Sequence, residues 1–260
     1  MKAVFICGTD TGVGKTYVAG KLYKELLDQG VSAVTQKWVQ TGSKGFSPDI
    51  AQHLKMAGKT RKDVKDILPL VNPYSFKFAS SPHLAARLEK KKIDVRKIKY
   101  SFKKLSKMFG FVIVEGAGGA LVPLNERTLM IDVVKELKMP VIIVAANKLG
   151  AINQTLMTIE VLKKRGVRIL GVIFNNIDRK TDKKILRDNI KTVEKITGLR
   201  IIPPLYLPLG KGETRLPARK AHICVAGGPK PNGGQVSRAK ARDRGGQNDR
   251  SLSFRSRKRH

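Results

Sequence analysis

A glycine-rich loop near the start of the chain has the residue types that hold phosphate groups. Gly8–Thr16 reads Gly-Thr-Asp-Thr-Gly-Val-Gly-Lys-Thr and lies between an apolar run and an amphipathic segment. Glycines let backbone N–H groups approach phosphate oxygens, and the start of the following helix adds a favourable partial charge. Lys15 would reach the β- and γ-phosphates, and the Thr16 hydroxyl would bind Mg²⁺. The spacing is one residue longer than the usual motif, but its context predicts a nucleotide site.

Other charged groups occur where apolar segments end. Lys37 ends the second apolar segment, and Thr41 follows beside Gly42. A Lys in an apolar strand is costly unless it meets an anion. One interpretation is therefore a bound anionic group, which the hydroxyl of Thr41 and the flexible backbone favour. The other interpretation is a Lys at an exposed sheet edge.

An acid stands at the end of a third apolar segment. Glu115 directly follows that run and precedes a glycine-rich turn that includes Gly118. A carboxylate in this position, facing a phosphate loop, is where nucleotide-bound Mg²⁺ finds a ligand. A helix cap or a turn acid is the alternative. Asp49 begins a short helix, where an ordinary capping or first-turn acid would also stand.

Two amides follow a later apolar segment. Asn175 and Asn176 come directly after Gly171–Phe174. A side-chain amide at a strand end can recognise an adenine edge through its paired donor and acceptor. A turn Asn is the alternative, and it is the more common role of Asn at such a position.

The elements that would position these groups alternate between strands and helices. We expect strands at Lys2–Gly8, Val31–Val39, Phe111–Glu115, Val141–Ala145, Ile169–Phe174 and from Ile201. We expect helices at Lys15–Gln29, Pro48–Ala57, Pro82–Glu89, Val95–Met108, Met130–Leu137, Ile152–Arg165 and Asp182–Ile196. This alternation predicts an α/β domain over residues 1–209, with a mainly parallel sheet covered by helices on both faces. Ligands of such sheets bind at the carboxyl ends of the strands, where the polar groups above stand.

Composition argues against several classes of protein. Cys7 and Cys224 are the only cysteines among 260 residues and make no disulfide framework. No run of about 18 apolar residues occurs, so we expect no membrane span. The short apolar start is followed at once by a glycine-rich turn, unlike a signal peptide. A reducing cytoplasm is therefore the expected location.

The charge is strongly basic and changes character along the chain. The formal net charge is +32, which raises nucleic-acid binding as one interpretation. Before Gly210, 29 Lys and 9 Arg stand against 17 acidic residues, spread over many predicted helices with little aromatic interleaving. We therefore expect a solvated basic surface there, and nucleic acid not to be the primary partner.

From Gly210 onward, 9 Arg outnumber 5 Lys. Gly, Arg, Ser, Gln and Asn dominate from Gly227 to His260, which is too polar a composition to form a core. We expect residues 210–260 to be a basic tail, disordered from Gly227. A nucleic-acid-binding arm and a non-native tail are the other interpretations, and the reversed Lys to Arg ratio favours the non-native tail.

Six segments of the chain together resemble the dethiobiotin synthetases in order and spacing. They are Gly8–Thr16, Lys37 with Thr41-Gly42, Asn72-Pro73-Tyr74, Ser81-Pro82-His83, Glu115–Gly119 and Lys148–Asn153. The resemblance covers Met1 to about Leu205. It implies a homodimeric P-loop NTPase-like fold with a parallel sheet, in a cytoplasmic enzyme of biotin biosynthesis.

The resemblance also implies a reaction. The substrate would be 7,8-diaminopelargonic acid, and carbon dioxide would form a carbamate on one of its amines. The γ-phosphoryl group of ATP would pass to the carbamate, giving a carbamic–phosphoric anhydride. The second amine would then attack, close the ureido ring and expel phosphate. The enzyme would thus be an ATP- and Mg²⁺-dependent ligase that makes dethiobiotin.

Site residues follow from the same resemblance. Catalytic roles fall on Lys15, Lys37 and Thr11, with Thr41 beside the carbamate, and the metal ligands are Thr16, Asp49 and Glu115. The nucleotide would be bound by Gly12, Val13, Gly14, Lys15, Thr16, Glu115, Gly118, Asn175 and Asn176. The substrate carboxylate would be bound from the partner subunit by Gly150, Ala151, Ile152 and Asn153, at a helix N-terminus.

The sequence departs from the family pattern at a few positions. Trp38 stands where the family usually has Pro, beside the predicted substrate loop, and Gly12 stands at a variable position. The chain after Leu205 differs from the family's base-binding loop and final helix. The alternatives are another P-loop enzyme, such as an amidating synthase or a partitioning ATPase, and an ATP-bound nucleic-acid module. Partitioning ATPases carry a second Lys early in the loop, where Thr9–Thr11 stand here.

Overall fold

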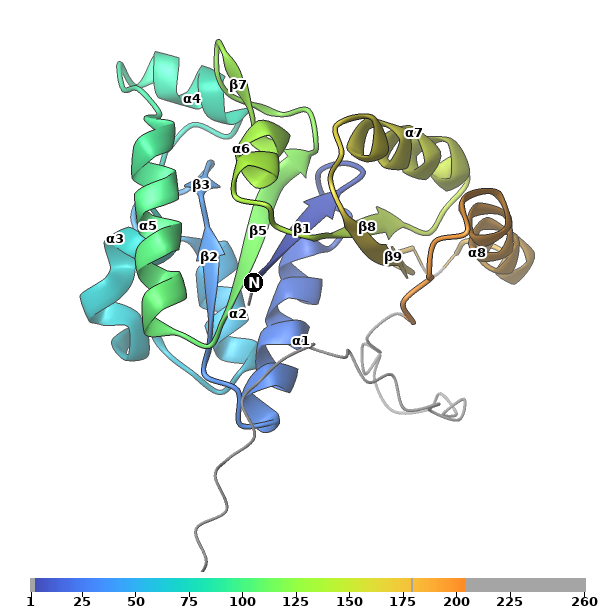
Figure 1. The fold of residues 1–260 in the computed structure, drawn as a ribbon, viewed down its shortest axis with the longest axis horizontal. Coiled ribbons are helices and arrows are strands. Elements are labelled where there is room, and N and C mark those ends of the chain that lie inside the picture. Colours follow the sequence, from blue (N-terminus) through green and yellow to red (C-terminus); the bar gives the residue numbers. More distant parts are fainter. Residues whose placement is uncertain (1–2, 179, 204–260) are drawn as a thin grey trace, which may run out of the picture. The chain divides into compact units, whose positions relative to one another are not determined.

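The computed structural model describes residues 3–178 and 180–203 (Figure 1). The predicted domain boundary near Leu209 and the predicted basic tail, residues 210–260, lie outside the described residues. So does the predicted membership of Lys2 in the first strand.

A five-stranded parallel sheet forms the centre of the fold, in the strand order β2-β5-β1-β8-β9. Its strands are β1 (Ala3–Gly8), β2 (Ala33–Lys37), β5 (Phe111–Gly119), β8 (Val141–Ala146) and β9 (Ile169–Asn175). The strands are buried along almost their whole length, since Val, Ile and Phe side chains fill both faces. An isolated parallel bridge between Val172 and Ile201 marks the predicted start of a last strand.

Helices cover both faces of this sheet (Figure 1). The longer ones are α1 (Lys15–Asp28), α2 (Pro48–Met56), α5 (Val95–Met108), α7 (Ala151–Lys164) and α8 (Lys183–Thr197), and the shorter ones are α3 (Leu68–Val71), α4 (Pro82–Leu88), α6 (Met130–Glu136) and the 3₁₀ helix η1 (Arg61–Ile67). Helix α1 packs on β1, β2 and β5, and α7 packs on β8 and β9. The predicted α/β architecture is therefore confirmed.

Helix ends follow local chemistry. The Asp94 side chain caps α5 by accepting from the Arg96 N–H at 2.8 Å, and Ser47 caps α2 by accepting from the Ile50 N–H at 3.2 Å. Helix α1 ends at Asp28, and Gly30 follows two residues later with φ of 74°, a conformation that glycine adopts without strain.

Two predicted strands have different bounds. The predicted strand Val31–Val39 is shorter as β2, and the chain then leaves the main sheet as β3 (Val39–Gln40), which pairs in parallel with β4 (Tyr74–Ser75). Trp38 marks the change of direction, since its indole is fully buried against Phe5 with the ring centroids 5.3 Å apart. The strand predicted to end at Glu115 continues to Gly119, where it pairs with Gly8.

Some elements had no sequence prediction. They are η1, α3, β3, β4 and the small hairpin of β6 (Pro123–Asn125) and β7 (Thr128–Leu129). Each is short, and tertiary contacts rather than periodicity determine such elements.

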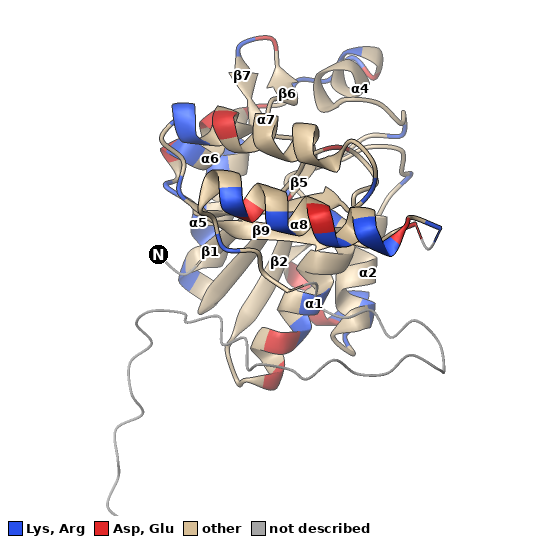
Figure 2. Ribbon diagram, turned by 90° about the vertical axis from the view of Figure 1, so that its right-hand side faces the viewer, with Lys and Arg blue, Asp and Glu red and all other residues tan. Residues whose placement is uncertain are grey.

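Surface charge is distributed over several elements in the described part. Figure 2 shows Lys and Arg on α5, α6 and α8, with acidic residues interspersed along α8. No helix among residues 3–178 and 180–203 is long and apolar enough to span a membrane.

Candidate active site

The glycine-rich loop joins β1 to α1 and wraps the N-terminus of that helix. Gly14 begins the helix with φ of 92°, and a Cβ atom there would lie 2.0 Å from Asn175 Nδ2. Only glycine fits this position, because both the backbone conformation and the approach of Asn175 exclude a side chain. The Lys15 ammonium folds back over the loop and donates to the Asp10 carbonyl at 2.8 Å. The backbone N–H groups of the first turn are thus presented to the same space as this ammonium.

A cluster of charges lies beside the loop, where the last residue of β2 pairs with Glu115 in β5. Glu115 Oε1 accepts from Thr16 Oγ1 at 2.9 Å and from Lys37 Nζ at 2.8 Å. Lys37 also lies 2.7 Å from Asp49 Oδ2 and donates to the Gly116 carbonyl at 2.9 Å. Parallel pairing of β2 with β5 places Lys37 directly opposite Glu115. The exposed-edge interpretation of Lys37 is therefore wrong, because its side chain is only 6% exposed.

Mutual attraction favours the charged forms of Glu115 and Lys37. Burial by itself would raise the pKa of Glu115, but the ammonium of Lys37 and the imidazole of His53 lower it to about 2. Burial would lower the pKa of Lys37, but the carboxylates of Glu115 and Asp49 outweigh it and raise this pKa. Burial and the nearby charge of Lys37 lower the pKa of Lys15.

One cavity of about 760 Å³ brings the two features together. Its lining includes ten of the predicted site residues: Thr11, Gly12, Gly14, Lys15, Thr16, Lys37, Thr41, Asp49, Glu115 and Gly118. The side facing α4 is formed by Ser80, Ser81 and Pro82. A cavity of this size with cationic, hydroxyl and carboxylate groups suits a polyphosphate and a small polar molecule.

The oxygen groups of the cavity fit Mg²⁺ bound together with phosphates. Mg²⁺ prefers oxygen ligands and, in nucleotide sites, takes one or two carboxylates plus phosphates and waters. Thr16, Asp49 and Glu115 all line the cavity and supply a hydroxyl and two carboxylates. In that part of the chain, no group of three or more His, Cys, Asp or Glu side chains forms a metal cage by itself.

Comparison with known proteins decides the family. A family model described as an AAA domain matches residues 2–206. The ATP-dependent dethiobiotin synthetase BioD 2 of Haemophilus influenzae is 40% identical over 174 residues, which cover 67% of this chain and 91% of that protein. The ATP-dependent dethiobiotin synthetase BioD of Methanococcus vannielii is 35% identical over 199 residues, which cover 76% of this chain and 90% of that protein.

The chain belongs to the ATP-dependent dethiobiotin synthetase family. Among solved structures, the MinC:MinD cell division protein complex of Aquifex aeolicus matches with a TM-score of 0.50 at 15% identity, covering 80% of this chain and 83% of that one. This likeness shows the P-loop fold alone.

In this dethiobiotin synthetase family member, three of the predicted nucleotide-binding residues do not line the phosphate-loop cavity. Val13 is buried, and its carbonyl accepts from Asn175 Nδ2 at 3.1 Å. Asn176 Oδ1 accepts from Asn147 Nδ2 at 3.0 Å. Asn175 thus holds the phosphate loop through the Val13 carbonyl. Recognition of adenine by Asn175 or Asn176 stays a prediction.

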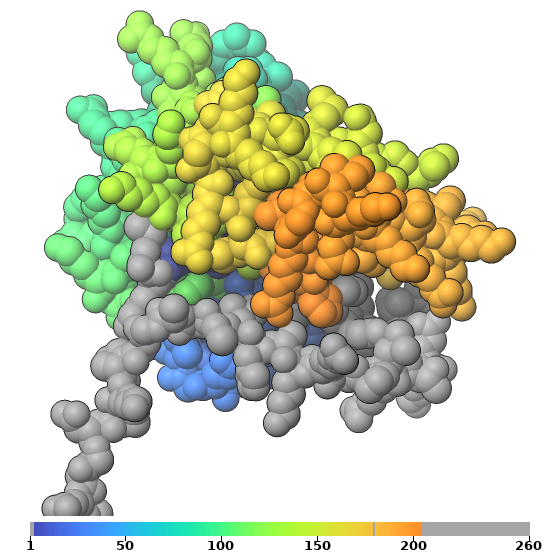
Figure 3. Space-filling model, turned by 45° about the vertical axis from the view of Figure 1, so that its right-hand side comes forward, coloured from blue at the N-terminus to red at the C-terminus, as the bar shows by residue number. Residues whose placement is uncertain are grey.

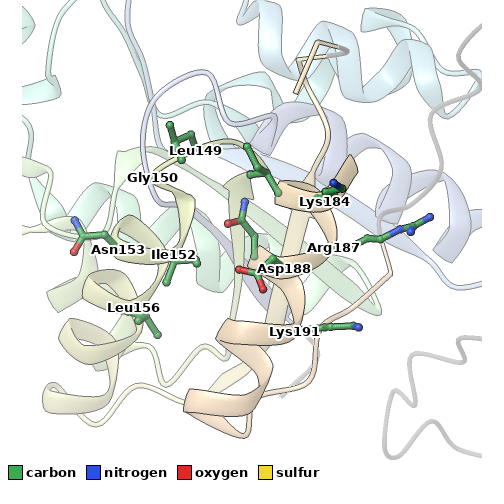
Figure 4. A pocket seen from close by; sticks show the side chains of 11 residues that line it. Leu149, Gly150, Ile152, Asn153, Leu156, Lys184, Arg187, Asp188 and Lys191 are labelled. Atoms are coloured by element: carbon green, nitrogen blue, oxygen red, sulfur yellow. The ribbon is translucent and has the colours of Figure 1, made fainter. Parts of the chain in front are cut away.

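The predicted carboxylate-binding segment lies elsewhere, at the N-terminus of α7. Gly150, Ile152 and Asn153 line a second hollow of about 840 Å³ with residues of α8, including Lys184, Arg187 and Lys191 (Figure 4). Ala151 is buried behind them. Figure 3 shows α7 and α8 side by side on one face of the molecule. Within one chain, therefore, the structure does not bring this segment into the phosphate-loop cavity.

The structure adds residues that sequence reasoning missed. His53 is fully buried on α2 with Nε2 2.9 Å from Glu115 Oε2. Its spacing of four residues from Asp49 was the available signal, because such residues share a helix face. Asn147 and Asn189 are buried and bonded to each other at 2.8 Å, and their separation by 42 residues gave no signal. Trp38, predicted to lie beside the substrate loop, is instead buried in the core with its Nε1 donating to Gln36 Oε1.

Proposed function

We propose that this protein catalyses the ATP-dependent carboxylation and ring closure of 7,8-diaminopelargonic acid to dethiobiotin. The observation that carries the proposal is the buried contact of Lys37 with Glu115 and Asp49 directly beside the phosphate loop. Such a cluster places cationic groups where negative charge would develop during phosphoryl transfer. Family membership supports the same reaction, since the relatives are named ATP-dependent dethiobiotin synthetases.

The loop and α1 would bind the phosphates of ATP. Gly12, Gly14, Lys15 and Thr16 line the cavity, and the N–H groups at the start of a helix favour a bound phosphate. The pKa of Lys15 is lowered by burial and by Lys37, so an arriving polyphosphate would favour its charged form. Mg²⁺, held by Thr16, Asp49 and Glu115, would neutralise charge on the phosphates.

Lys37 would act on the carbamate side. After carbon dioxide adds to one amine, a carbamate oxygen attacks the γ-phosphorus and ADP leaves. The second amine then attacks the carbamate carbon and closes the ring. Phosphate leaves and keeps the carbamate oxygen that had attacked the γ-phosphorus. The Lys37 ammonium would stabilise the charge that builds up on the carbamate and the transferring group, while Thr11 and Thr41 contact them from the cavity wall.

The base and the substrate carboxylate would be bound after β8 and β9, on the side of the phosphate loop away from β2 and β5. Asn175 and Asn176, at the end of β9, would contact the adenine. Gly150–Asn153 would bind the carboxylate of the diamine from a partner subunit in a homodimer, since the N-terminus of a long helix favours an anion. Their separation from the phosphate-loop cavity within one chain supports this arrangement. A cytoplasmic location is part of the same proposal.

Phosphate release by the full chain tests the function. The assay contains ATP, Mg²⁺ and bicarbonate, with and without 7,8-diaminopelargonic acid, and dethiobiotin is detected by mass spectrometry. We expect release that depends on the diamine and is matched by dethiobiotin formation. A folded protein that binds ATP but shows no diamine dependence would overturn the proposal and would favour another P-loop enzyme.

A further inference from the structure

Helix α2 directs two polar side chains toward the charge cluster. Asp49 and His53 are four residues apart and therefore lie on the same face of the helix. The helix start is fixed by Ser47, which is fully buried and donates to Gln40 Oε1 at 2.6 Å. Farther along, α2 packs closely on α1, since a Cβ atom at Gly20 would lie 3.3 Å from His53 Cα. The capped helix start and the close contact with α1 thus fix the backbone position of His53.

The imidazole of His53 faces the oxygen of Glu115 that accepts no hydrogen bond from any described group. Oε1 of this carboxylate accepts from Thr16 and Lys37, whereas Oε2 lies 2.9 Å from His53 Nε2. The distance is that of a hydrogen bond, but the orientation is not that of a well-formed one, and neither ring nitrogen has another partner in the described part of the chain.

The position of this contact has a chemical consequence for a metal ligand. A carboxylate that binds a metal through one oxygen is commonly held by a hydrogen bond to the other oxygen, and loss of such a partner costs metal affinity. Lys37 also contacts Glu115, but through the oxygen that Thr16 shares. His53 is therefore placed to hold the carboxylate through the oxygen to which neither Thr16 nor Lys37 donates.

We propose that His53 is a positioning residue, which holds Glu115 through Oε2 so that Oε1 stays available to Thr16 and to the Mg²⁺ of the bound nucleotide. This inference rests on the proposed role of Glu115 as a metal ligand. It assigns to His53 no contact with the substrates.

Metal affinity can be measured without turnover. Mg²⁺ is titrated into the full chain with a non-hydrolysable ATP analogue, and the increase in melting temperature gives the half-saturating concentration. His53→Leu removes the donor at similar volume, whereas His53→Gln keeps an N–H donor at a similar reach. We expect about a tenfold increase in the half-saturating Mg²⁺ concentration for His53→Leu and less than about a threefold increase for His53→Gln. Gln52→Leu, at an exposed position of the same helix, is the matched control and should not change it.

Turnover at varied Mg²⁺ gives a second measurement. We expect His53→Leu to raise the Mg²⁺ requirement strongly while kcat at saturating Mg²⁺ falls much less, because the chemical groups remain. A purely structural role of His53 would instead lower the melting temperature and leave the half-saturating Mg²⁺ concentration unchanged.

The outcomes separate this inference from the proposed function. A folded His53→Leu protein with wild-type Mg²⁺ dependence overturns the inference, even if the wild type makes dethiobiotin. If His53→Leu does not fold, His53→Gln decides, and a tenfold loss of Mg²⁺ affinity despite the retained donor overturns the inference. A Mg²⁺ shift in a protein without diamine-dependent turnover would support the role of His53 and remove only the proposed reaction.

Discussion

The phosphate-loop cavity and the α7–α8 hollow are built from different kinds of polar group. In the first, buried ions hold one another, as Lys37 lies between Glu115 and Asp49. Behind the second, neutral amides form a network around the buried Asn147 and Asn189. Asn147 donates to the exposed Asn176 and accepts from Asn189, which also donates to the Lys148 carbonyl at 3.0 Å. The phosphate-loop cavity thus contains paired ionic groups, whereas the amides behind the α7–α8 hollow hold the local backbone in place.

The difference indicates what each region has to do. Buried charges are costly unless paired, and a paired cluster beside a cavity can exchange its partners for an anionic substrate or a metal. A satisfied amide network has no such capacity, but it sets the geometry of the segment between β8 and α7. We therefore expect substitutions in the phosphate-loop cavity to lower turnover. Substitutions at the α7–α8 hollow should instead lower stability or disturb the placement of the substrate.

Removal of the central cation should have the largest effect. Lys37→Ala should lower turnover by about 10²- to 10³-fold, because a preorganised cation is lost from the transferring group, while much of the ATP affinity remains. Steady-state kinetics and binding of a fluorescent ATP analogue measure the two quantities. Lys103→Ala, an exposed change on α5, is the control. Near-normal turnover of Lys37→Ala would remove Lys37 from the site.

Mixing two inactive variants tests whether the second region serves a partner subunit. Lys37→Ala and Asn153→Ala should each be inactive alone in the proposed homodimer. After mixed refolding, about half of the dimers are mixed and carry one intact site of two, so about a quarter of wild-type activity should return. No recovery, despite mixed dimers shown by differently tagged chains, would mean that each site is completed within one chain.

A change in the amide network should reduce stability. Asn147→Ala should lower the free energy of unfolding by about 2 kcal/mol, because the amides of Asn176 and Asn189 lose a buried partner. Urea unfolding measures this change. Asn153→Ala, an exposed change at the same helix start, should alter the free energy of unfolding by less than about 0.5 kcal/mol. Equal effects of the two changes would contradict a structural role of the network.

Low pH should change the stability contribution of the phosphate-loop cluster but not that of the amide network, and this is the smallest of the expected effects. The folded-state pKa of Glu115 is about 2, below its ordinary value of 4.5, so its ionisation stabilises the fold above about pH 4.5 and this contribution is lost as pH falls toward 2. The stability difference between wild type and Glu115→Gln should therefore shrink between pH 5 and the lowest pH at which both fold. The cost of Asn147→Ala should stay constant over that range. A pH-independent cost of Glu115→Gln would contradict the pairing.

The periodicity of apolar residues in the sequence predicted most of the helices and strands. Long apolar or amphipathic segments, such as β8 and α5, have bounds within a residue of their predicted ones, because periodicity and capping act over a few neighbouring residues. The phosphate loop was recognisable because its glycines, Lys15 and Thr16 are contiguous. Short elements such as β3 and η1 gave no such signal, since their partners are distant in sequence.

The sequence by itself determined that a phosphate loop precedes a helix and that acids and a Lys stand at strand ends. Only the tertiary structure decided which of these groups meet. Parallel pairing of β2 with β5 places Lys37 opposite Glu115, 78 residues apart, and the packing of α2 on α1 adds Asp49 and the unpredicted His53. Strand register and helix packing depend on the whole core, so no local pattern reports them.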